Sequence, residues 1–234
     1  MKHLLALTVL SLFALAVPAA ENPVADVKAA AGKLAEQPSY AWTSTPKSEG
    51  QQRFRLGPTV GKLEKGGWLH TKSTMGDSEV EVLRKGEQAA VKREGEWRTL
   101  ADIESGDRGA FWARRIRNFK APAADAGDLA GQTKGLAKAA DGSYAGELTA
   151  EGAQGLLTWG GRGANSPAFQ NAKGSVTFWL KDGLLAKYEY KVSGSFKRPD
   201  NDEEMTIDRT VTVEIKEVGK TKVVVPDEVK QKLS

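Results

Sequence analysis

The chain has 234 residues, of which 40% are hydrophobic, and it carries a formal net charge of +4. This length and apolar content suit one good-sized globular domain or two small ones. The absence of cysteine excludes disulfides and an acylated cysteine, and so small a positive charge gives no reason to expect nucleic acid as a partner.

Residues 1–20 have the features of a secretory signal peptide. Lys2 gives a basic start, an uncharged and mainly apolar stretch covers residues 4–17, and small residues follow it. We expect cleavage after Ala19 or Ala20, and the bacterial style of the signal predicts a periplasmic protein. The apolar stretch is short for a transmembrane helix, although an uncleaved anchor is the alternative.

Residues 22–38 are predicted to form a helix. Asn22 can cap its first turn, Pro23 suits the first helical position, and Pro38 lies just beyond its end. A narrow apolar stripe along this helix indicates packing against another element, and the stripe consists of Val24, Val27, Ala31 and Leu34.

Residues 39–100 have the pattern of a β-meander. Short turn signals separate about seven predicted strands, two of them at 52–58 and 59–65, and connections this short require antiparallel neighbours. In another strand Val80 and Val82 alternate with glutamates and therefore share a face. The turn signals are Gly66-Gly67, Gly76-Asp77, Lys85-Gly86 and Glu94-Gly95.

Residues 107–119 break the strand pattern and are predicted to form a helix. Its large apolar residues recur at close to helical spacing, and they are Phe111, Trp112, Ile116 and Phe119. The arginines of the same segment could contact lipid headgroups or an acidic partner, or form an ordinary solvated face; they are Arg114, Arg115 and Arg117.

The following residues are less regular. Residues 121–142 are rich in Ala and Gly and are predicted to form a flexible connection with one short helix around 126–137. Residues 144–157 predict a short strand and then a helix capped by Thr149, and residues 159–174 predict a long loop.

Residues 178–190, FWLKDGLLAKYEY, predict a β-hairpin. Asp182-Gly183 favours a type I′ turn, which would pair Leu180 with Leu185 and Trp179 with Ala186. One face would then hold Val176, Phe178, Leu180 and Leu185, and the other Trp179, Ala186, Tyr188, Tyr190 and Val192. A sheet covered on both sides, or curved around a hollow, would bury the apolar side chains of both faces. A one-residue bulge near the turn would move part of each set to the opposite face.

The last third of the chain returns to β structure. Residues 205–218 predict a long strand, and a short helix is predicted to begin at Pro226. No shift in composition divides the chain, which favours a single domain over residues 21–234. One face of the long strand carries Ile207, Val211, Val213 and Ile215.

Catalytic chemistry has little support in this sequence. His70 is the only histidine after the signal peptide, so a Ser–His–Asp arrangement or a zinc site would depend on it. An ordinary strand histidine is the simpler interpretation, and no G-x-S-x-G motif is present. We therefore expect no catalytic residue, no metal, no cofactor and no enzyme, with a glycosidase-type carboxylate pair as the alternative.

Two loops suggest ligands only weakly. The acidic residues of 200–204 could hold calcium, but their spacing does not match an EF-hand, and charged hairpin tips are usually solvated. The glycines of 160–163 could suggest phosphate binding, but the Walker lysine is missing.

The order of elements and three short motifs resemble a known superfamily. The motifs are GELTAEG at 146–152, DGLLAKYEY at 182–190 and GKTKVVVPDEVKQKL at 219–233. Together with the helix, the meander and the helical insertion, they resemble the LolA-like superfamily of bacterial lipoprotein carriers, which includes LolB, LppX/LprG and the amino-terminal domain of RseB.

This resemblance implies an α+β fold. We expect a curved antiparallel sheet of about 10–11 strands that forms an unclosed β-barrel, with helices covering its concave side. The hollow between sheet and helices takes acyl chains in this superfamily. LolA holds its lid closed with a strand arginine, and either Arg53 or Arg55 could be the counterpart here.

The resulting prediction is a non-catalytic periplasmic protein that binds or carries a lipid or lipoprotein by its acyl chains, with an inner- or outer-membrane protein as a transient partner. A hydrophobic cavity alone could supply the affinity. The alternative is an envelope-sensing or protein-interaction domain of the same fold without lipid cargo. Candidate cavity residues are Trp42, Phe54, Trp68, Trp179, Tyr188 and Tyr190, and the candidate lid residues are Phe111, Trp112, Ile116 and Phe119.

Overall fold

The computed structural model describes residues 21–49, 56–76, 78–105, 109–158, 169–197 and 202–233. Several features predicted from the sequence lie outside these ranges. They are the signal peptide 1–20, Arg53, Phe54, Arg55 and the glycine loop 160–163.

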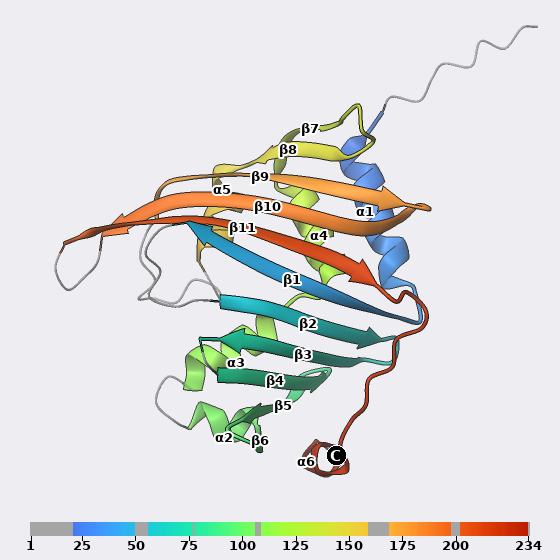
Figure 1. Cartoon of the computed structure of the whole chain (residues 1–234), viewed down its shortest axis with the longest axis vertical. Coiled ribbons are helices and arrows are strands. Elements are labelled where there is room, and N and C mark those ends of the chain that lie inside the picture. The colour runs from blue at the N-terminus through green and yellow to red at the C-terminus, as the bar shows by residue number, and fades with distance from the viewer. Residues whose placement is uncertain are drawn as a thin grey trace, which may run out of the picture.

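Eleven strands form one antiparallel sheet in the order β6-β5-β4-β3-β2-β1-β11-β10-β9-β8-β7. The sheet is curved and its edge strands β6 and β7 do not meet (Figure 1), which confirms the predicted α+β fold with an unclosed barrel. The strands are β1 (Ser39–Glu49), β2 (Leu56–Glu64), β3 (Trp68–Met75), β4 (Ser78–Lys85), β5 (Gln88–Arg93), β6 (Glu96–Thr99), β7 (Thr133–Lys138), β8 (Tyr144–Leu148), β9 (Gln170–Lys181), β10 (Leu184–Lys197) and β11 (Glu204–Lys216).

Most helices lie on one side of the sheet, which we call the concave face (Figure 1). Apolar side chains of α1, α4 and α5 share one core with β1, β9, β10 and β11, and α3 packs on β4 and β5. The helix α6 packs on the opposite, convex face, where Val229 meets Leu83. The helices are α1 (Pro23–Ala35), α2 (Leu100–Glu104), α3 (Gly109–Asn118), α4 (Pro122–Gly131), α5 (Ala150–Leu157) and α6 (Asp227–Lys232).

The local signals at α1 and α5 act as predicted. The Asn22 side chain accepts a hydrogen bond of 3.1 Å from the Ala25 amide, and Pro23 is the first residue of α1. The Thr149 hydroxyl accepts one of 3.0 Å from the Gly152 amide at the start of α5. These caps satisfy amides that the first helical turn leaves without partners.

In the 178–190 hairpin, the side chains are divided between the two faces differently from the prediction. Asp182 and Gly183 both have positive φ, as a type I′ turn requires, and Leu180 pairs with Leu185. The register then shifts, so that Trp179 pairs with Lys187 rather than with Ala186. This bulge reverses the faces beyond it and places Tyr188 opposite Phe178. The large buried side chains of both strands therefore share the concave face.

Several element boundaries also differ from those predicted. Segments 56–58 and 59–64, which were assigned to separate strands, are continuous in β2. The connection 121–142 contains α4 followed by β7 rather than one helix around 126–137. Pro226 caps α6 and does not occupy its first turn. In each case the sequence signal was local, whereas the sheet and the core fix the boundary.

Candidate functional site

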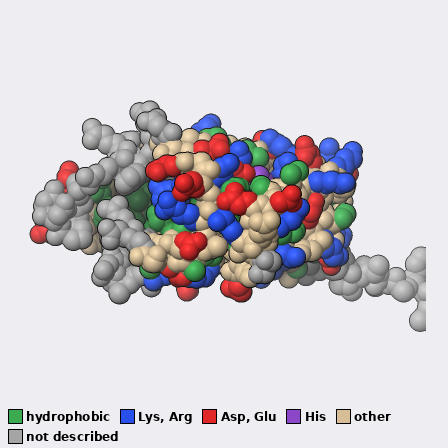
Figure 2. Space-filling view, turned by 90° about the horizontal axis from the view of Figure 1, so that it is seen from below, with side chains coloured by type: hydrophobic (Ala, Val, Ile, Leu, Met, Phe, Trp, Pro, Cys, Tyr) green, Lys and Arg blue, Asp and Glu red, His purple; other side chains and the backbone are tan. Residues whose placement is uncertain are grey.

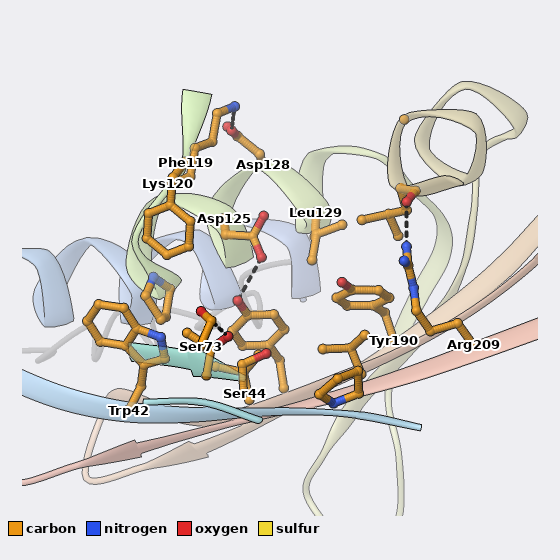
Figure 3. Close-up of a pocket in the computed structure, with 18 of the residues that line it drawn as sticks. Trp42, Ser44, Ser73, Phe119, Lys120, Asp125, Asp128, Leu129, Tyr190 and Arg209 are labelled. Atoms are coloured by element: carbon orange, nitrogen blue, oxygen red, sulfur yellow. Dashed lines mark hydrogen bonds and ion pairs between the residues drawn. The ribbon is translucent and has the colours of Figure 1, made fainter. Parts of the chain in front are cut away.

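A pocket of about 510 Å³ lies between the concave face and the helices that cover it (Figure 3). Strands β1, β2, β3, β10 and β11 form its floor, and α4, α5 and the end of α3 form its cover. A smaller pocket of about 100 Å³ adjoins it beneath α3, and Arg115 and Phe119 line both. The layered fold thus leaves two adjoining hollows over the middle of the sheet.

One side of the large pocket is aromatic. The Trp42 side chain is only 2% exposed, and its ring stacks on Phe119 with centroids 6.3 Å apart. The ring lies directly over Gly61, where a Cβ atom would come within 2.0 Å of Trp42 Cζ2. Glycine at this position of β2 is therefore required for the indole to lie flat on the sheet.

A buried polar pair crosses the pocket from strand to helix. The Tyr188 hydroxyl donates a 2.7 Å hydrogen bond to Asp125 Oδ2 on α4. Burial raises the pKa of Asp125 above its ordinary value and, together with the neighbouring carboxylate, raises the pKa of Tyr188. Burial also raises the pKa of Tyr190 to about 12. All three groups are thereby biased toward their neutral forms.

Two arginines also line the pocket. Arg209 lies on β11 between Ile207 and Val211 on the same face, is only 7% exposed, and donates through Nη2 to Leu156 O at 2.6 Å. Arg115 extends from α3, where burial and then the positive charge of Arg209 lower its pKa to about 10. The hollow therefore contains placed cationic groups and is not lined by hydrocarbon alone.

A third arginine fixes the end of α3 to the sheet. Arg84 Nη1 on β4 donates to the carbonyl oxygens of Ile116, Arg117 and Phe119, at 2.9, 3.2 and 3.1 Å respectively. Those carbonyls belong to the end of the helix, where a cation also interacts favourably with the helix dipole. The helix predicted as a lid is thus tied to the strand beneath it.

The structure brings together only some of the predicted site residues. Trp42, Tyr188 and Tyr190 line the large pocket together with Phe119, whereas Trp112 and Ile116 line the smaller one. Phe111 is 45% exposed and lines neither.

Trp68 and Trp179 lie on the convex face. Trp68 packs against the core beneath α6. Lys187 Nζ lies 4.3 Å from the centroid of the Trp179 ring. Phe54 is outside the described residues.

Sequence reasoning missed Arg84, Asp125 and Arg209. Strict alternation along β11 could have found Arg209, because it occupies the same face as Val211 and Val213. No comparable signal marks Asp125, which lies in the Ala-rich segment that becomes α4.

His70 and the charged surface do not suggest a catalytic centre. His70 Nε2 lies 2.7 Å from Glu81 Oε1, on the convex face. Within the described ranges, no three His, Asp or Glu side chains are placed to hold a metal, and no described helix is long and apolar enough to cross a membrane. Basic and acidic side chains are interspersed over the end of the molecule near α2 and α6 (Figure 2).

The fold and the pocket define a protein of the half-barrel class, in which an unclosed sheet curves around covering helices. This is the architecture that the LolA-like resemblance implies. No protein-family model and no curated protein sequence matches the chain significantly.

Solved structures that resemble it include LprF from Mycobacterium bovis, with 11% identity and a TM-score of 0.48 over 87% of this chain and 95% of that one. The Mycobacterium tuberculosis lipoprotein LppX has 12% sequence identity and a TM-score of 0.47, over 87% of this chain and 98% of that one. A DUF1329 family protein from Desulfovibrio piger has 12% sequence identity and a TM-score of 0.32, over 92% of this chain and 100% of that one. Similarities this low do not by themselves assign an activity.

Proposed function

We propose that the protein is a non-catalytic lipid-binding protein of the bacterial periplasm, which holds the acyl chains of a lipid or lipoprotein in the concave pocket. The observation that carries this proposal is the hollow itself, because about 510 Å³ lies within the roughly 300–1,000 Å³ typical of small-molecule pockets. Its aromatic side, together with Val211 and Val213 of the floor, suits a hydrocarbon chain. Each buried CH₂ group stabilises the complex by about 0.8 kcal/mol.

In this proposal α3 is the lid. Among the side chains of α3, only those of Ala113 and Ile116 are buried in the core beneath it, whereas Phe111 is exposed. The contact with Arg84 at its end is polar and can be broken without exposing a large apolar surface. Movement of α3 would open the smaller pocket and, through Phe119, the large one.

Lipid extraction tests the proposal directly. The full chain with its signal peptide would be expressed in a bacterium and exported. The mature protein would then be purified and extracted with organic solvent, and the extract analysed by mass spectrometry. We expect a co-purifying lipid, and the delipidated protein should bind a fluorescent fatty acid that unlabelled lipid displaces. If no lipid is found and no displacement occurs, the lipid proposal is wrong, and the envelope-sensing or protein-interaction alternative becomes the better one.

A matched pair of substitutions locates the binding site. Val211→Phe places a larger side chain in the pocket, because Val211 lines it and is 7% exposed. Val60→Phe makes the same chemical change at a position that is 47% exposed and does not line the pocket. We expect only the first to weaken fatty-acid binding, with both variants keeping the circular dichroism of the parent. Equal effects would place the binding site elsewhere.

A further inference from the structure

A row of hydroxyl groups crosses the floor of the large pocket. Ser44 on β1 lies opposite Thr59 on β2, and Thr59 lies opposite Ser73 on β3. Residues that face each other in this way on neighbouring strands share one side of the sheet, and all three line the pocket. Figure 3 shows Ser44 and Ser73 on the floor between Trp42 and Tyr190. Three neighbouring strands thus present hydroxyl groups side by side to whatever fills the hollow.

Apolar side chains of the floor flank this row. On β1 the nearest residues on the same face as Ser44 are Trp42 and Pro46, which also line the pocket. Val213 of β11 lies opposite Ser44 and continues the row with an apolar side chain. Arg209, the charged residue of the floor, lies farther along β11 and outside the row. A ligand that lies along β1 therefore meets hydrocarbon of the floor on either side of the row and hydroxyl groups in between.

The hydroxyl groups of the row satisfy one another only in part. The Thr59 and Ser73 hydroxyl oxygens lie 2.8 Å apart and form one hydrogen bond, in which one group donates and the other accepts. Among the residues that the structure describes, Ser44 has no side-chain hydrogen bond. Each hydroxyl group has one hydrogen to donate and two lone pairs, so the row can form further hydrogen bonds. A plain hydrocarbon chain laid over it would take these groups out of water without replacing their partners, which is unfavourable.

A chain that carries a hydroxyl group at the level of the row would replace those partners. A hydroxyl group can donate to one side chain of the row and accept from another, whereas an ester or ether oxygen can only accept. We propose that the pocket takes a hydroxylated acyl chain, whose hydroxyl group hydrogen-bonds to Ser44, Thr59 and Ser73 while its hydrocarbon lies against Trp42 and Pro46 on either side. This inference rests on the proposed function and names the class of lipid.

Fatty acids that differ only in a hydroxyl group test the inference separately from the proposed function. Ricinoleic acid is oleic acid with one hydroxyl group part-way along the chain, and 3-hydroxymyristic acid is myristic acid with one near the carboxyl end. Each acid would be titrated against delipidated protein that carries a fluorescent fatty acid without hydroxyl groups. Because a hydrogen bond between neutral groups makes a modest net contribution, we expect at least one hydroxylated acid to bind about fivefold more tightly than its unsubstituted counterpart.

Ser44→Ala and Ser73→Ala should each remove most of this preference. The unsubstituted acid should bind to each variant at least as tightly as to the parent protein, because alanine presents no polar group for the chain to cover. This retained binding also shows that the variants are folded. Ser175→Ala is the matched control and should keep the preference, because Ser175 on β9 is exposed and lines neither the large nor the smaller pocket.

Several results would overturn the inference but not the proposed function. They are equal binding of the two acids in both pairs, a preference that either pocket variant keeps in full, and an equal loss of preference in Ser175→Ala. Glycerol has hydroxyl groups but no chain, so it should not displace the probe at millimolar concentration; displacement would mean that the row binds a free polyol, and the inference would be wrong. If none of the four acids displaces the probe, the inference and the proposed function both fail.

Discussion

The Arg84→Met substitution should loosen α3 selectively. Methionine keeps most of the apolar stem but removes the guanidinium group that contacts the carbonyls of Ile116, Arg117 and Phe119. Those contacts share the two hydrogens of Nη1, so they amount to about two hydrogen bonds rather than three. Hydrogen bonds to a charged group contribute roughly 1.5–3 kcal/mol each when buried.

Because Arg84 is only partly buried, a value at the lower end of this range is appropriate for the whole interaction. We expect the local stability of α3 to fall by about 2 kcal/mol, which corresponds to about thirtyfold faster amide exchange. Hydrogen exchange followed by mass spectrometry or NMR measures this directly for residues 113–118. The amides of β10 and β11 provide an internal reference for global unfolding.

Arg98→Met serves as the control, because the Arg98 side chain is exposed and pairs with Glu96 rather than with α3. Release of a bound fluorescent fatty acid should also become faster in Arg84→Met if α3 is the lid. Unchanged exchange in α3, or exchange that increases equally in β10 and β11, would refute the view that Arg84 holds this helix locally.

Three further substitutions test the pocket and the core. Burial raises the pKa of Asp125, so the folded protein binds this proton more tightly than the unfolded chain, and its stability falls as the pH rises above the ordinary value of 3.8 toward the raised one. Asp125→Asn removes this dependence and keeps an acceptor for Tyr188. The melting temperature of the variant minus that of the parent should therefore rise as the pH increases through this interval. A difference that is constant with pH would contradict this. Gly61→Ala should destabilise the protein by about 1–3 kcal/mol in urea unfolding, because the new Cβ would displace the Trp42 ring; an unchanged midpoint would show that the ring moves freely. Val229→Ala should cost about 2 kcal/mol in the same assay, since this fully buried side chain anchors α6, and no loss would mean that α6 is dispensable.

Local chemistry in the sequence predicts much of the sheet. The turn at Asp182-Gly183 and the caps at Asn22 and Thr149 depend on backbone geometry that a few neighbouring residues determine. Such signals place the meander in β1–β6 and the long hairpin of β9 and β10. The curvature around covering helices followed from the family resemblance and not from these signals.

The pocket was harder to predict because it depends on register and distant contacts. One extra residue, Ala186, moves Tyr188 and Tyr190 to the same face as Phe178, and no local pattern requires that bulge. Asp125 acquires its role only when α4 meets β10. A charged residue such as Arg209 breaks the apolar pattern by which a buried face is recognised.

The central pair of the sheet joins strands from opposite ends of the chain. Strand β1 pairs with β11 over nine residue pairs from Ala41↔Lys216 to Glu49↔Asp208, whereas every other strand pair joins strands that follow each other in sequence. Closing so long a loop is entropically unfavourable and slow, so the two meanders should fold before they join. Because β1 and β11 supply Trp42, Val213 and Arg209 to the lining of the pocket, a partly synthesised chain lacks part of this pocket. The pocket is therefore complete only after the last strand is in place.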